Sequence, residues 1–91
     1  MDATTPADGT VLAVPPTEIA LNFSDKLRLT KVEASHSSGD TQSIDLDDHK
    51  AFSNTFTLPM APMGAGIYEV EWRGLGVDGH AMRGSFSFEV E

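Results

Sequence analysis

The strongest constraint on the fold is the alternation of apolar and polar residues in the last third of the chain. Residues 68–73 alternate Tyr, Val and Trp with Glu and Arg, and residues 85–90 alternate Ser and Glu with Phe and Val. Residues 18–23 show the same period of two. Because successive side chains of a strand point to opposite faces, each segment predicts a strand with one dry face and one solvated face. This pattern is typical of antiparallel sheet.

Residues that favour turns separate these segments at intervals of roughly ten residues, the spacing of a β-sandwich or small barrel. Gly, Pro, Ser and Asp cluster between them, for example at Ser24-Asp25. Shorter extended segments are expected at 11–14, 31–35, 42–46 and 55–58, and at most one helical turn at 48–52. The sequence therefore predicts one all-β domain over residues 1–91.

Composition excludes several classes of protein. The formal net charge of −8 argues against nucleic acid and against anionic lipid as partners, since both require clustered Lys and Arg. The chain has no cysteine, so it contains no disulfide, and a metal site would use His, Asp, Glu or Met. No apolar run approaches 18 residues, so no membrane-spanning helix is expected.

The candidate metal ligands are His, Asp and Met residues in the predicted loops. Asp78-Gly79-His80 lies between the last two strands, which would mount a carboxylate and an imidazole on a rigid hairpin. If the strands simply run up and down, successive loops alternate between the two ends of the domain. One end would then gather Asp25, His49, Asp78 and His80, and the other His36, Met60 and Met63.

The two sets of ligands favour different metals. Nitrogen and oxygen donors suit Cu(II), Ni(II) or Zn(II), whereas thioethers suit Cu(I), so copper is the metal that could use both ends. Simpler interpretations remain open, because Asp-Gly is a common turn pair and an exposed His is often only solvated. We expect His36 and His49 to be solvated loop residues, Met63 and Met82 to pack inward, and Met60 to be either open or packed.

A set of segments, in order and with regular spacing along nearly the whole chain, resembles one known family. The segments are Thr5-Pro-Ala-Asp-Gly9, Ile19-Ala-Leu-Asn-Phe-Ser-Asp25, Gly66-Ile-Tyr-Glu-Val-Glu-Trp-Arg73, Asp78-Gly-His80 and Gly84-Ser-Phe-Ser-Phe88. Together they resemble the CopC family of periplasmic copper-binding proteins. The resemblance implies a seven-stranded Greek-key β-barrel or sandwich of cupredoxin- or immunoglobulin-like shape.

The resemblance also implies a function. A CopC-like protein would be a non-enzymatic copper carrier of the periplasm, taking part in copper homeostasis or resistance, often beside a CopD-type membrane copper transporter. The family's Cu(II) site uses an amino-terminal His together with the Asp and His of an Asp-x-His loop, which Asp78 and His80 match. An acidic residue after a Phe-Ser pair is sometimes implicated, and here it is Asp25. We expect a monomer that binds Cu(II) rather than Cu(I).

The chain departs from the family pattern at two places. No His precedes Thr5-Pro6, and residues 34–45 contain no Met where some members carry a Met-rich Cu(I) loop. The alternative is therefore a CopC-like β-sandwich that has lost tight copper binding and serves a structural or protein-interaction role. An enzyme is disfavoured, because the sequence suggests no pair of nucleophile and base.

Overall fold

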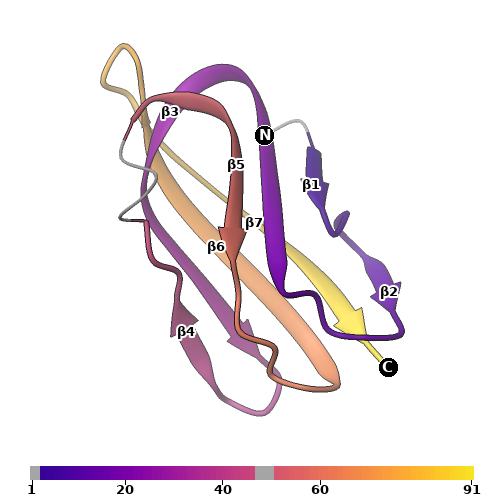
Figure 1. The fold of residues 1–91 in the computed structure, drawn as a ribbon. Coiled ribbons are helices and arrows are strands. Elements are labelled where there is room, and N and C mark those ends of the chain that lie inside the picture. The colour runs from indigo at the N-terminus through magenta and orange to yellow at the C-terminus, as the bar shows by residue number, and fades with distance from the viewer. Residues whose placement is uncertain (1–2, 47–50) are drawn as a thin grey trace.

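The computed structural model describes residues 3–46 and 51–91, and within them all regular structure is β (Figure 1). This confirms the predicted fold class. Seven strands are found in the described residues: β1 (Ala3–Thr5), β2 (Thr10–Leu12), β3 (Glu18–His36), β4 (Thr41–Ser43), β5 (Ser53–Pro59), β6 (Gly66–Gly76) and β7 (Ala81–Val90). None of the described residues belongs to a helix long and apolar enough to cross a membrane.

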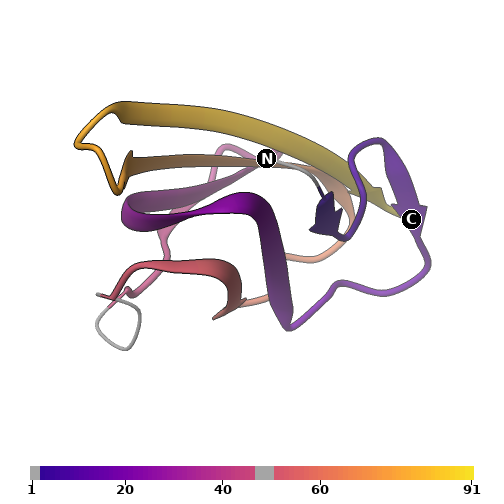
Figure 2. The same cartoon turned by 90° about the horizontal axis from the view of Figure 1, so that it is seen from above.

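Strand β3 is a single bent strand where the sequence predicted two strands and a turn at Ser24-Asp25. Its first part pairs with β1 and β5, and its second part pairs with β4 and β6. The register shifts between Asn22 and Leu27, and such an irregularity lets a strand bend without ending. The prediction of a break was wrong because the polar residues at the bend belong to this irregularity. The sheet curls into two layers, and the bend carries β3 from the layer that contains β1 and β5 to the layer that contains β4 and β6 (Figure 2).

The strand order is β1-β3-β6-β7-β2, with β4 and β5 also paired to β3. The β2–β7 pair is parallel, whereas the other pairs are antiparallel. β4 pairs with the second part of β3, β5 with its first part, and β6 again with its second part. The predicted up-and-down order of the strands was therefore wrong. The β3–β6 ladder runs from Leu27↔Gly76 at the end that leads to Asp78 and His80 to His36↔Tyr68 at the opposite end, so the hairpin and His36 lie at different ends of the domain.

The core lies between the layers and includes the inward-facing residues of the predicted alternation. Tyr68 and Trp72 are buried, as predicted; Tyr68 stacks on Phe88, and Phe23 meets Trp72 edge to face. The buried residues of the core are Ile19, Leu21, Phe23, Leu27, Leu29, Val32, Ala34, Ile44, Phe56, Leu58, Met60, Tyr68, Val70, Trp72, Phe86, Phe88 and Val90. Met82 was predicted to pack inward, but it lies at the hairpin end of β7 and is 38% exposed.

Candidate metal site at the Asp78–His80 hairpin

The hairpin between β6 and β7 is shaped by its own backbone and by one carboxylate. Gly79 N–H donates to the carbonyl of Gly76, and Gly76 N–H donates to the carbonyl of His80. Gly79 has a φ of 85°, in the left-handed region that glycine adopts without strain. Asp78 Oδ1 accepts the backbone N–H of His80 at 3.1 Å, the local bond that favours Asp in turns. The sequence Asp-Gly-His therefore forms a turn, as its simpler interpretation also predicted.

The same turn brings the two candidate ligands into direct contact. His80 Nδ1 lies 2.6 Å from Asp78 Oδ2, so the side chains converge although both are exposed. The hydrogen bonds from His80, first from its side chain and then from its backbone, lower the pKa of Asp78 below its usual value of 3.8. Asp78 is therefore a carboxylate at neutral pH, and the loop holds a negatively charged oxygen against the imidazole of His80.

Gly76 supplies the space that this arrangement requires. A Cβ atom on Gly76 would lie 3.0 Å from Asp78 Oδ1, which is closer than ordinary van der Waals contact. The carboxylate thus packs over the end of β6. Gly76, the last residue of β6, was not among the predicted site residues. The sequence signal that could have identified it is a glycine two positions before Asp78.

The other residues predicted for this end do not complete a metal site. Asp25 is exposed and lies at the bend of β3, near the end of the domain that carries the hairpin. Among residues 3–46 and 51–91, however, no group of three or more His, Asp or Glu side chains could hold a metal ion. His49 lies outside the described residues. The structure therefore brings together Asp78 and His80, and it does not add Asp25 to them.

His36, predicted to be a solvated loop residue, is instead buried at the end of β3, with 8% of its surface exposed. Its Nδ1 accepts Ser38 N–H at 3.1 Å, so the proton lies on Nε2, which donates to the carbonyl of Ala65 at 3.0 Å. The ring also meets Tyr68 edge to face at 4.7 Å. The alternation of β3 contained the signal, since His36 follows the inward-facing Val32 and Ala34.

The two methionines predicted at the His36 end both pack on the core; this was expected of Met63, whereas Met60 could have been either open or packed. Met60 is the core residue, with 3% of its surface exposed, and Met63 is only partly buried against the core. The Tyr68 hydroxyl fixes the segment between them and β6 by accepting Met63 N–H at 2.8 Å and donating to the carbonyl of Gly64 at 2.6 Å. In this arrangement His36 offers no free nitrogen to Cu(I), and Met60 is committed to the core.

Comparisons with known proteins agree with this fold. The CopC domain model matches residues 1–91. Among solved structures, CopC from Methylosinus trichosporium OB3b superposes with a TM-score of 0.77 at 22% identity, covering 97% of this chain and 88% of that one. PcoC from Escherichia coli, described as a copper resistance protein, gives a TM-score of 0.68 at 26% identity, covering 100% and 98%.

A search of curated protein sequences finds no match. The assignment therefore rests on the family model, which spans every residue of the chain, and on the shared architecture of the solved structures. The chain belongs to the CopC family.

Proposed function

We propose that this protein is a copper carrier that binds Cu(II) at the Asp78–His80 hairpin and passes it on without chemical conversion. The observation that carries the proposal is the convergence of His80 Nδ1 and Asp78 Oδ2 on an exposed turn. Membership of the CopC family and the likeness to a copper resistance protein support copper as the ion.

The contact has nearly the spacing that two neighbouring ligands of one ion require. Ligand atoms about 2.0 Å from an ion and at right angles to each other lie about 2.8 Å apart. Nδ1 and Oδ2 are 2.6 Å apart, so an ion could replace the shared proton with only a small opening of the turn. Nitrogen and oxygen donors in this arrangement match the tetragonal preference of Cu(II).

The donor set also bears on affinity. Two protein ligands leave most positions of a Cu(II) ion to water or to ligands from elsewhere. A third donor that contributed about 1.4 kcal/mol of binding free energy would raise the affinity tenfold. An exposed, unsaturated site suits a carrier, because an acceptor can approach the ion directly. We place this carrier in the periplasm, as a monomer that delivers copper to a CopD-type membrane transporter.

Copper titration followed by electron paramagnetic resonance tests the assignment. The protein should take up Cu(II) with nitrogen hyperfine coupling from one imidazole, and both the coupling and the affinity should fall in His80→Ala. Asp78→Asn should keep the turn, because an amide oxygen can still accept the His80 N–H, but it should weaken binding by removing the charge. Glu89→Gln is the matched control, since it removes the same charge from an exposed position toward the other end of β7.

An identical signal and affinity in the parent and in His80→Ala would refute the site. His49→Ala and Asp25→Asn then ask whether the other two predicted ligands contribute. If no variant changes copper binding and the parent binds only weakly, the alternative role of a β-sandwich without tight copper binding is favoured. The specific observation behind that alternative is that the described residues place only two donors at the hairpin.

A further inference from the structure

A row of cations crosses the outer face of the sheet, separated from the hairpin by two pairs of the β6–β7 ladder. Arg73 on β6 lies directly opposite Arg83 on β7 and, on its other side, directly opposite Lys31 on β3. All three residues are exposed. These positions alternate with the buried Val32 and Trp72, so the three side chains belong to the solvated face of the sheet. The register therefore fixes three positive charges side by side on three neighbouring strands.

The two arginines of this row are not neutralised. Lys31 pairs with Glu33 at 2.6 Å, but neither Arg73 nor Arg83 forms an ion pair within the part of the chain that the structure describes. Like charges directly opposite each other in an antiparallel pair destabilise a sheet. The arrangement is unexpected in a chain with only six Lys and Arg residues and a net charge of −8, since three of the six stand in this one row.

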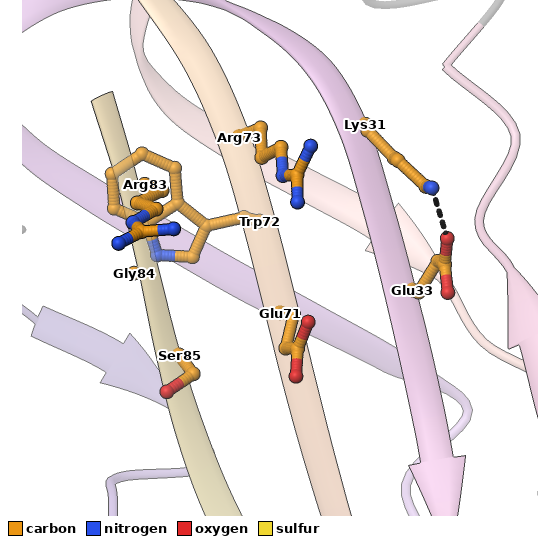
Figure 3. Close-up of a pocket in the computed structure, with 8 residues that line it drawn as sticks. All are labelled: Lys31, Glu33, Glu71, Trp72, Arg73, Arg83, Gly84 and Ser85. Carbon is orange, nitrogen blue, oxygen red and sulfur yellow. Dashed lines mark ion pairs between the residues drawn. The ribbon is translucent and has the colours of Figure 1, made fainter. Parts of the chain in front are cut away.

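The row borders an open hollow of about 430 Å³ on the surface of the sheet. Figure 3 shows the residues around it, which come from β3, β6 and β7. They are Lys31, Glu33, Glu71, Trp72, Arg73, Arg83, Gly84 and Ser85. Glu33 and Glu71 stand opposite each other in the next row of the same face, so the cationic row is bounded on that side by acidic side chains.

We propose that the row Lys31–Arg73–Arg83 binds a small oxyanion, a phosphate or carboxylate group, in this hollow. Guanidinium groups bind such oxygens through two hydrogen bonds at once, and neighbouring arginines would share the negative charge of one ligand. A bound anion would also relieve the repulsion between Arg73 and Arg83. The acidic row beside it limits the ligand to a compact group, because a longer polyanion would lie over Glu33 and Glu71. This site is separate from the copper hairpin and does not depend on the proposed function.

Titration of the full chain with sodium phosphate and, in a second arm, with citrate tests the site at low ionic strength. Nuclear magnetic resonance of the arginine side chains should show saturable shifts at Arg73 and Arg83. Arg83→Gln should weaken binding at least tenfold. Arg28→Gln is the matched control, because Arg28 carries the same charge but lies 5.8 Å from the ring of Phe52, outside the row. Sodium chloride at equal ionic strength separates specific binding from screening.

Thermal unfolding provides a second readout, first without an anion and then with one. Without anion, Arg83→Gln should unfold roughly 1–5 °C above the parent, because the like-charge pair is removed. Phosphate or citrate should raise the Tm of the parent and of Arg28→Gln, but not that of Arg83→Gln. Shifts that do not saturate, or equal losses in Arg83→Gln and Arg28→Gln, would overturn the proposal. The arm with the lower dissociation constant identifies phosphate or carboxylate as the preferred group.

Discussion

The two ends of the domain each present a histidine near the end of a long strand, and they use it in opposite ways. His80 sits in an exposed turn, with Nδ1 on a carboxylate and no hydrogen bond from Nε2 to any residue that the structure describes. His36 is buried, with both ring nitrogens bonded to neighbours at 3.1 Å or less. The comparison teaches that a histidine counts as a candidate ligand only when a nitrogen is available, which depends on its surroundings and not on its presence in a loop.

The difference follows from where each residue falls in the strand pattern. His36 continues the inward-facing positions of β3, so it must satisfy its polar atoms inside the protein. His80 follows Gly79, whose left-handed backbone turns the chain away from the sheet. The structure therefore uses one imidazole in packing and leaves the other exposed, and four predictions test whether the exposed one is the copper ligand.

The largest expected effect is on stability at the buried end. His36→Ala should lower the free energy of unfolding by about 2–4 kcal/mol, because it leaves a cavity and removes hydrogen bonds to Ser38 and Ala65. His80→Ala should change it by less than about 0.5 kcal/mol, as expected of an exposed side chain. Urea denaturation followed by Trp72 fluorescence measures both. Equal losses in the two variants would break the comparison.

The next effect concerns copper at the exposed end. His80→Ala should weaken Cu(II) binding at least tenfold, or about 1.4 kcal/mol, because it removes the only nitrogen donor of the hairpin. A conservative variant at the other end, His36→Gln, should leave the affinity unchanged wherever it remains folded. Competition with a chelator of known affinity measures both constants. If His36→Gln bound copper more weakly than His80→Ala, copper would bind at the His36 end and the hairpin site would be refuted.

The pH dependence of copper binding should come from the imidazole and not from the carboxylate. Imidazole must lose its proton to bind, and its ordinary pKa is about 6.5, so affinity should fall as the pH drops below that value. Because hydrogen bonding lowers the pKa of Asp78, this carboxylate stays charged above its usual value of 3.8, and its contribution is lost only at more acidic pH. Copper affinity should therefore fall continuously in a titration from pH 7.5 to 5. A flat profile would contradict a His ligand.

The smallest effect is expected at Gly76, where no ligand is changed. Gly76→Ala should weaken Cu(II) binding a few-fold, because its new Cβ would lie 3.0 Å from Asp78 Oδ1 and displace the carboxylate. Gly39→Ala, in the turn that follows His36, is a useful comparison, since its φ of 100° strains any Ala while the space around it is open. It should lower stability without changing copper affinity. An unchanged affinity in Gly76→Ala would show that the carboxylate is not held as tightly as its contacts indicate.

The predictable part of this protein was its alternation. The segments 68–73 and 85–90 fall within β6 and β7, and their apolar residues are core, as the period of two predicted. The break at Ser24-Asp25 was not predictable in the same way, because turn-forming residues also occur in a bulge that bends a continuous strand. Local composition cannot distinguish these cases, since the difference lies in the partners on both sides of β3.

By itself the sequence determined an all-β domain, its core faces and the adjacency of Asp78 and His80, because a strand's side chains alternate and a short turn keeps its residues together. Only the tertiary structure decided which donors are available. Burial satisfies His36 through Ser38 and through Ala65, 29 residues away, and the register of three strands sets Arg73 against Arg83. These outcomes depend on pairings between distant segments, and such pairings follow from how the whole chain buries its apolar faces.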